Sequence, residues 1–312
     1  MMPPIPNLPE SLLHKALKYA LVAIAALALV AGTVLAAGVW LGGRKLARTV
    51  DVRVVPVPYS RDATALRHGR YLFETRGCGE CHGMDGRGRK LIDNEGMQVH
   101  APNLTAGRGS AVAAYNEGDW VRAIRHGVDP RGRALFLMPS EDYNRMTDVD
   151  LAALVGYTRS LPPVDGEAAL VRLPLMVKAF YGLGVIPDAA QKIDHRLPPS
   201  QPVPAAATVE HGAYVANMCK GCHNASFSGG RVMGAPPEWP PASNLTPGEG
   251  GVMARYDSIE KFAAMLRTGK RPDGSAVSSA MPFESLRNLN EVDVRAMHAF
   301  LRALPARRTG EH

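Results

Sequence analysis

Cys78-Gly79-Glu80-Cys81-His82 and, 141 residues later, Cys219-Lys220-Gly221-Cys222-His223 contain all four cysteines of the 312-residue chain. Both segments have the form C-x-x-C-H, which is typical of covalent haem attachment. Two thiols at this spacing can add to the two vinyl groups on one edge of a haem, and the adjacent histidine then lies beneath the iron as an axial ligand. The sequence therefore predicts two haems, each bound through two cysteines and one histidine.

Two other kinds of site also use paired cysteines. A zinc site built from four cysteines usually places its C-x-x-C pairs about 15–20 residues apart, whereas 141 residues separate them here. A thioredoxin-like redox motif requires a βαβ context, and neither pair has β-rich flanks. No cysteine remains for a disulfide framework or a further thiolate site. Covalent haem is therefore the favoured interpretation of both motifs.

The two motifs lie within a longer internal repeat. A shift of 141–143 residues aligns His68-Gly-Arg-Tyr71 with His211-Gly-Ala-Tyr214. The same shift aligns four further pairs of segments: Pro102–Thr105 with Ser243–Thr246, Trp120–Gly127 with Phe262–Gly269, Met138-Pro139 with Met281-Pro282, and Ser160–Pro162 with Ala303–Pro305. An internal match this long indicates two copies of one domain. We therefore predict tandem domains at residues 63–162 and 209–306.

Each copy shows the same three helix signals. A short helix leads into the motif at residues 63–76 and 209–218, a middle helix follows at 117–126 and 258–267, and a final helix lies at 148–160 and 291–303. Acidic residues occupy the first turn of each final helix, where the helix dipole stabilises them. No alternating pattern of useful length predicts a strand, so the expected fold class is all-α.

The sixth iron ligands are inferred from the repeat. Met138 and Met281 each precede a proline in a loop just before the final helix, 56 and 58 residues after the motif histidines. A methionine in an apolar neighbourhood is often only core filler, and Met146 and Met297 are weaker candidates. We predict His82 and Met138 as ligands of the first iron and His223 and Met281 as ligands of the second, which leaves no open coordination position.

Matched polar residues are candidates for the haem propionates. Arg125 and Arg267 occupy equivalent positions in the middle helices, and an arginine fork suits a carboxylate; the alternative is a solvated helix face. Asn103 and Asn244 lie 21 residues after the motif histidines and either cap the haem-edge loop or bind a propionate.

The remaining matched residues point to packing rather than chemistry. Tyr71 and Tyr214 are predicted to pack between the first and last helices of each copy. Four histidines outside the motifs could in principle bind iron, but each also suits a solvated loop or a helix end and is a poor candidate: His68, His100, His126 and His211. No catalytic triad, phosphate loop or carboxylate pair stands out, so no catalytic residue is predicted.

The N-terminal segment predicts a membrane anchor. Residues 19–43 run for 25 positions without a charge, and about 20 apolar residues span a bilayer, whereas a signal-peptide core is only about 7–15. Because bacteria attach haem c outside the cytoplasmic membrane, residues 1–18 should be cytoplasmic and residues 44–62 an external linker. The alternative is cleavage after Ala36 or Ala37.

The segment between the two copies is a Pro-rich linker at residues 163–208 with an apolar middle, residues 173–187. It is either a strap packed on the domains or a docking surface for a partner subunit or the membrane face. Residues 307–312 form a short tail. The net charge of +7 comes without a basic run interleaved with aromatics, so nucleic-acid binding is not predicted.

With these motifs in place, the chain resembles a class I cytochrome c duplicated in tandem. More narrowly, it is similar to the membrane-bound cytochrome c subunits of bacterial alcohol, gluconate and sorbitol dehydrogenase complexes. The matching segments are Gly69–Leu72, Pro102–Thr105, Trp120–Gly127, Leu137–Pro139 and Tyr157–Pro163. Together with the internal repeat and the N-terminal apolar run, the resemblance leads us to expect two tandem cytochrome c domains preceded by a single transmembrane helix. Those subunits usually carry three haem domains and a C-terminal membrane attachment, and this chain departs from both features.

The predicted function is electron transfer on the outer, periplasmic face of the cytoplasmic membrane, and not enzymatic catalysis. The expected partners are redox proteins of a larger complex, namely a dehydrogenase or quinol-oxidising complex as donor and an acceptor such as a terminal oxidase. Two alternatives are a dihaem peroxidase and a haem-based ligand sensor. Both require an accessible iron, which the matched Met-Pro loops argue against.

Overall fold

The computed structural model describes residues 10–94, 96–235 and 238–311. The first half of the predicted cytoplasmic segment, residues 1–9, lies outside the described residues, as does His312 of the tail. The chain divides into two compact units. One contains the chain up to Leu46 together with Pro174–Ile186, and the other contains Ala47–Leu173 and the chain from Pro187 onward.

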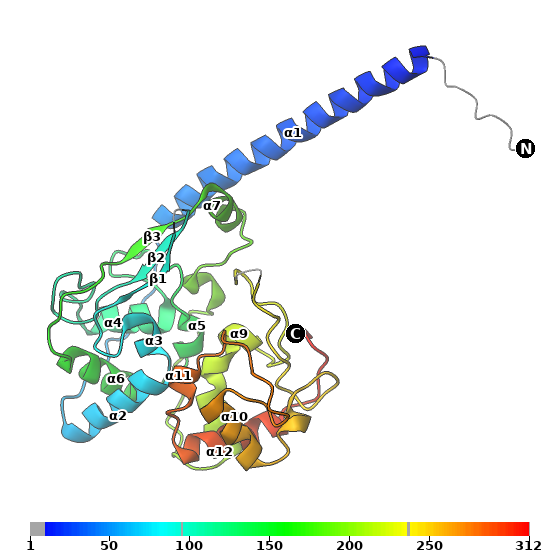
Figure 1. Cartoon of the computed structure of the whole chain (residues 1–312). Helices are drawn as coiled ribbons and strands as arrows, with labels where there is room; N and C mark the ends of the chain where they lie inside the picture. Colours follow the sequence, from blue (N-terminus) through cyan, green and yellow to red (C-terminus); the bar gives the residue numbers. More distant parts are fainter. Residues whose placement is uncertain (1–9, 95, 236–237, 312) are drawn as a thin grey trace, which may run out of the picture. The chain divides into compact units, whose positions relative to one another are not determined.

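The described part of the first unit contains two helices. Helix α1 (Glu10–Ala47) contains the uncharged run, and its stretch His14–Ala47 is long and apolar enough to cross a membrane. Helix α7 (Leu175–Gly182) comes from the interdomain linker and packs against the C-terminal part of α1, as Figure 1 shows. The apolar middle of the linker therefore folds with the N-terminal helix.

The second unit contains both sequence repeats, and their elements correspond in order. The first repeat comprises α2 (Ala63–Thr75), α3 (Cys78–His82), α4 (Glu117–His126), α5 (Ser140–Tyr143) and α6 (Asp148–Ser160). The second repeat comprises α8 (Val209–Val215), η2 (Ala216–Cys219), α9 (Lys220–His223), η3 (Met253–Arg255), α10 (Ile259–Thr268), α11 (Phe283–Leu286) and α12 (Glu291–Ala303). A 3-10 turn, η1 (Ala189–Lys192), lies in the linker. The structure thus bears out the predicted helices within a few residues.

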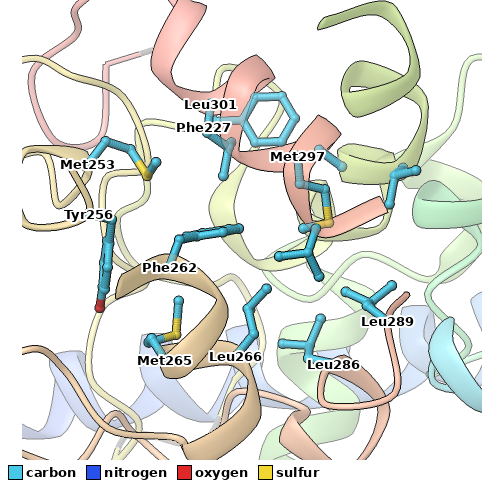
Figure 2. Packing of buried hydrophobic residues seen from close by; sticks show 13 residues of the cluster. Phe227, Met253, Tyr256, Phe262, Met265, Leu266, Leu286, Leu289, Met297 and Leu301 are labelled. Carbon is cyan, nitrogen blue, oxygen red and sulfur yellow. The ribbon is translucent and has the colours of Figure 1, made fainter. Parts of the chain in front are cut away.

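A close helix crossing forms the base of each repeat. The first and last helices touch at a glycine: a Cβ on Gly69 would lie 2.0 Å from the carbonyl oxygen of Ala153, and one on Gly212 would lie 2.0 Å from that of Ala296. No larger side chain fits at either position. Apolar residues from the remaining helices complete each core, and Figure 2 shows Phe262, Leu266, Leu286 and Met297 converging in the second repeat.

The helix ends follow local capping rules. The side chain of Asn116 caps α4 in a capping box with Asp119, and Ser258 caps the equivalent helix α10. Both helices end at a glycine in the left-handed region, Gly127 with φ 63° and Gly269 with φ 68°, where side chains other than glycine are strained. These caps explain why the helix bounds could be predicted from the sequence.

A small sheet that the all-α expectation did not include accompanies the helices of the first repeat. Strands β1 (Arg89–Asp93), β2 (Gln98–Ala101) and β3 (Leu170–Arg172) form an antiparallel sheet in the order β1-β2-β3. Strands of three to five residues are too short for a reliable alternation signal. In addition, β3 belongs to the linker, far from the other two in sequence. The fold is nevertheless mostly helical.

Candidate haem sites

The motif histidines are held by the same backbone contact in both repeats. The Nδ1 atom of His82 lies 2.9 Å from the carbonyl oxygen of Pro102, and that of His223 lies 2.7 Å from the carbonyl oxygen of Ser243. A carbonyl can only accept, so Nδ1 carries the proton and Nε2 keeps its lone pair for a metal. Burial lowers the pKa of both imidazoles and favours this neutral form. Each histidine therefore has its Nε2 available to bind a metal.

Burial disfavours the thiolate form of all four motif cysteines. Burial raises the pKa of Cys78 and of Cys219 to about 12, and it also raises the pKa of Cys81 and Cys222. A zinc site instead gathers thiolates around one point. Among the described residues, no group of three or more His, Cys, Asp or Glu side chains is placed to hold a metal ion. The pairs therefore fit thioether attachment better than zinc binding.

The candidate methionines differ in burial from their alternatives. Met146 and Met297 are 6% and 2% exposed and belong to the two apolar cores; Met297 is visible there in Figure 2. Met138 and Met281 are only half-buried and lie at the edges of these cores, each directly before the proline that starts α5 or α11. The structure explains Met146 and Met297 as packing residues, and Met138 and Met281 remain the predicted ligands.

The matched arginines occupy different environments. Arg125 is buried, and its terminal nitrogen Nη2 donates to the carbonyl oxygen of Met146 at 2.5 Å and to Asp148 at 2.8 Å. Its Nε, like Nε1 of Trp120 on the same helix, is buried without a hydrogen-bond partner among the described residues. A buried donor left unpaired costs about 1–3 kcal/mol. Two such donors fit an anionic haem propionate, whereas Arg267 is exposed on α10.

The matched asparagines stabilise the haem-edge loops. The buried side chain of Asn103 donates to the carbonyl oxygens of Arg108 and Val164 and accepts from the backbone of Thr105. Asn244 makes the equivalent bonds to Glu249, Arg307 and Thr246. Because both amide protons are engaged, these residues act as loop caps rather than propionate ligands.

Comparisons with known proteins agree with this geometry. Residues 64–157 match the family model for "Cytochrome C oxidase, cbb3-type, subunit III". The chain is 26% identical over 280 residues to the fructose dehydrogenase cytochrome subunit of Gluconobacter japonicus, covering 81% of this chain and 55% of that one. It is 24% identical over 268 residues to the gluconate 2-dehydrogenase cytochrome c subunit of Pantoea cypripedii, covering 78% and 60%.

A shorter match has higher identity. The chain is 35% identical over 100 residues to the cytochrome c subunit of the quinone-dependent alcohol dehydrogenase of Gluconobacter oxydans (strain 621H), covering 30% of this chain and 21% of that one. The chain belongs to the c-type cytochromes. A cytochrome c domain implies covalently bound haem c, as the motif at Cys78–His82 predicted. The cytochrome spans about half the length of the two relatives that it matches most widely.

The two repeats of the cytochrome meet through a reciprocal pair of tyrosines. The hydroxyl of Tyr71 in α2 donates to Asp293 in α12 at 2.7 Å and accepts from the backbone of Asn290 at 3.2 Å. In the reverse direction, Tyr214 in α8 donates to Asp150 in α6 and accepts from the backbone of Thr147. The tyrosines were predicted to pack within their own repeats, but their hydroxyl groups cross to the other repeat.

Each of these aspartates also accepts a hydrogen bond from a histidine of its own repeat. His68 lies 2.7 Å from Asp150, and His211 lies 2.7 Å from Asp293. Asp293 further pairs with Arg76 at 3.1 Å. Burial alone would raise the pKa of both carboxyl groups, but these donors outweigh it and lower the pKa of each. Neither histidine is therefore needed as an iron ligand.

The helices that contain the C-x-x-C-H segments, α3 and α9, lie at this same interface. Glu80 in α3 accepts a hydrogen bond from the backbone of Ser285 in α11 at 2.9 Å. In the other direction, Asp142 in α5 accepts from the backbone of Gly221 in α9 at 2.7 Å, and its carbonyl oxygen accepts from Asn217. Each C-x-x-C-H segment thus contacts the short helix that follows the other repeat's Met-Pro. Sequence reasoning missed this arrangement, because the paired residues are more than 70 positions apart.

Proposed function

We propose that this cytochrome is a dihaem electron-transfer subunit, anchored by α1 with its repeats on the outer face of the cytoplasmic membrane. It would accept electrons from a dehydrogenase or quinol-oxidising complex and pass them to an acceptor such as a terminal oxidase. The observation that carries this proposal is the same locked histidine beside a C-x-x-C pair in both repeats. Bound haem supplies the one-electron chemistry.

The chain's own residues divide the work of holding each haem. The cysteines of each motif would tether the cofactor, and Nε2 of His82 and of His223 would each bind an iron. Met138 and Met281 would supply the second protein ligand in each repeat, and a methionine ligand raises the potential relative to two histidines. In the first repeat, the buried and unpaired Nε of Arg125 would donate to a propionate. In the second repeat, water and the exposed Arg267 would donate to the propionate instead.

The contact between the repeats supports electron exchange between the two haems. Helix α3 touches α11, and α9 touches α5, so each cofactor's attachment point adjoins the ligand loop of the other repeat. The tyrosine–aspartate pairs hold this contact from both sides. We infer that an electron received by one repeat passes to the other within the chain.

The relatives favour a role inside a larger redox complex. Three of them are named as cytochrome subunits of fructose, alcohol and gluconate dehydrogenases, and the family model describes an oxidase subunit. These names fit the predicted donor and acceptor classes and argue for an electron-transfer subunit rather than an enzyme. The apolar helix α1 is compatible with the membrane anchor.

Carbon monoxide binding separates this proposal from a dihaem peroxidase. With methionine on both irons, the reduced protein should show no spectral change under carbon monoxide, and the oxidised protein should not turn over hydrogen peroxide. A Met138→Ala variant is the positive control, since it opens one position and should bind one equivalent. Carbon monoxide binding by the wild type at either iron would overturn the proposed ligation and favour the enzyme.

A further inference from the structure

Helix α7 contacts α1 backbone to backbone. A Cβ on Gly42 would lie 2.2 Å from the carbonyl oxygen of Lys178, and one on Gly38 would lie 3.0 Å from the Cβ of Ala179. On the other side, a Cβ on Gly182 would lie 2.1 Å from the carbonyl oxygen of Gly38. Glycine at these three positions therefore lets the two helices touch, and larger residues would separate them.

A lysine fixes the end of α7 to α1. Nζ of Lys45 donates to the carbonyl oxygens of Tyr181 at 2.9 Å and Ile186 at 3.0 Å. It also lies 4.0 Å from the centre of the Tyr181 ring. A cation at a helix C-terminus stabilises the unpaired carbonyls and the dipole. Helix α7 and the turn after it are thus bound to one position along α1.

The outer side of α7 is apolar and exposed. Five large side chains in and just after the helix have exposed fractions between 42% and 64%: Leu175, Met176, Phe180, Leu183 and Val185. Soluble surfaces rarely carry so many adjacent apolar side chains without a binding partner. On α1, Trp40 at the same level is also exposed, and tryptophan is enriched where a membrane meets water.

The position of α7 along α1 identifies what covers this surface. About 20 residues span the hydrocarbon core, so a span centred in the uncharged run at residues 19–43 ends near Leu41. Gly38 and Gly42, which contact α7, therefore lie at the boundary of the core, and Arg44 and Lys45 lie just beyond it. Amphipathic helices that rest in a leaflet bury their apolar face at this depth.

We propose that α7 lies in the outer leaflet against the end of α1, with Leu175, Met176, Phe180, Leu183 and Val185 in contact with lipid. The chain would then touch the membrane twice, once through the span and once through the linker between the repeats. This inference rests on the proposed anchoring by α1. A partner subunit or a second copy of the chain would instead cover α7 with protein, and the test distinguishes the two.

The test uses photocrosslinking of the full-length, haem-loaded chain in vesicles of phosphatidylethanolamine and phosphatidylglycerol. Benzoylphenylalanine replaces Phe180 in one variant, Leu27 of the span in a second, and Val149, which is 64% exposed on α6, in a third. The expected result after irradiation is a mass increase of one phospholipid at positions 180 and 27 and none at position 149.

Three results would contradict the proposal in different ways. No adduct at 180 with an adduct at 27 would place α7 in water. A crosslink from 180 to a second chain would show that protein covers it. No lipid adduct at 27 would refute the anchor itself and, with it, the position of α7.

A second pair of variants tests the contact with α1. In the chain labelled at 180, Gly42→Val should push α7 off α1 and abolish the lipid adduct, while the adduct at 27 persists. Gly32→Val is the matched control, because a Cβ there meets no atom within 4 Å, and it should leave both adducts unchanged. Equal adduct yields at position 180 in the two variants would show that α7 does not depend on α1 for its place.

Discussion

In the first repeat, Arg125 is buried with an unpaired Nε, whereas its counterpart in the second repeat, Arg267, is exposed on α10. The backbone around the histidines, by contrast, is the same in both: a carbonyl accepts from Nδ1, and an asparagine closes the loop. Cofactor attachment requires fixed geometry, so that part is repeated. The charge nearby is free to differ, and we expect this difference to give the two predicted haem sites different potentials.

The contact between the repeats also combines a repeated geometry with a difference in charge. The tyrosine–aspartate pairs are reciprocal, but within the described part of the chain only Asp293 also forms an ion pair with an arginine, Arg76. The position equivalent to Arg76 holds Asn217, which instead donates to the backbone of Asp142. The two halves of the interface are therefore equal in shape and unequal in charge.

The largest predicted effect concerns the axial methionines. Met138→His should lower one haem potential by a few tenths of a volt, a fraction of the roughly 0.8 V that axial ligation spans, because imidazole stabilises ferrous iron less than thioether sulfur does. Met281→His should lower the other. Spectroelectrochemical titration measures both potentials.

Met146→Leu and Met297→Leu are the controls for ligation, since both residues are in the apolar cores. They should leave both potentials close to the wild-type values. A lowered potential in Met146→Leu together with unchanged potentials in Met138→His would contradict this assignment. It would show that Met146, and not Met138, binds the first iron.

The next effect concerns the interface. Tyr214→Phe should lower the free energy of unfolding by about 1–3 kcal/mol, because it removes the donor to one carboxylate oxygen of the mostly buried Asp150 and leaves only His68 on the other. Tyr71→Phe should cost less, since Asp293 keeps Arg76. Urea denaturation of the full chain in detergent measures both. Tyr157→Phe is the control, because its hydroxyl makes no hydrogen bond within the described residues, and a cost as large as that of Tyr214→Phe would argue against the reciprocal contact.

The buried arginine should affect one haem only. Arg125→Gln removes a positive charge that disfavours oxidised iron, so the first haem's potential should fall by about 30–60 mV, equivalent to roughly 0.7–1.4 kcal/mol for one electron. Arg267→Gln is the matched control and should shift the second potential much less, because water screens the exposed charge. Equal shifts in the two variants would show that burial at this position does not separate the repeats.

The smallest effect is the acid dependence of the interface. The pKa values of Asp150 and Asp293 are lowered in the folded chain, so the unfolded state binds more protons at low pH. The contribution of these groups is fully present above about pH 4, the ordinary value for aspartate, and is lost as the pH falls further. Asp293→Asn should therefore show a weaker loss of stability between pH 5 and 3 than the wild type. An identical loss would mean that Asp293 is not held as a carboxylate by its neighbours.

Local patterns in the sequence predicted the motifs and the helices. The C-x-x-C-H segments, the capping residues Asn116 and Ser258, and the terminal glycines each act within a few positions, so a single sequence is enough to find them. The family comparisons bear out the cytochrome class. The ligation by Met138 and Met281 and the number of haems stay predictions.

Contacts between distant residues could not be predicted. Tyr71 and Asp293 are 222 positions apart, and nothing near either residue indicates the other. Strand β3, which lies in the linker, pairs with β2. Helix α7 contacts α1 through glycines, and the residues next to these glycines in sequence do not indicate which helix they contact. The repeat alignment also suggested equal roles for Arg125 and Arg267, but alignment cannot show that one is buried and the other exposed.

The amount of haem per chain tests the account most directly. Pyridine haemochrome absorbance against protein concentration should give two haems c for the full chain, both retained after denaturation and acid-acetone extraction. Replacing Cys78 and Cys81 by alanine should leave one, and replacing Cys219 and Cys222 should also leave one. A single haem in the wild type, or two haems retained in either double variant, would contradict the assignment of one covalent haem to each repeat.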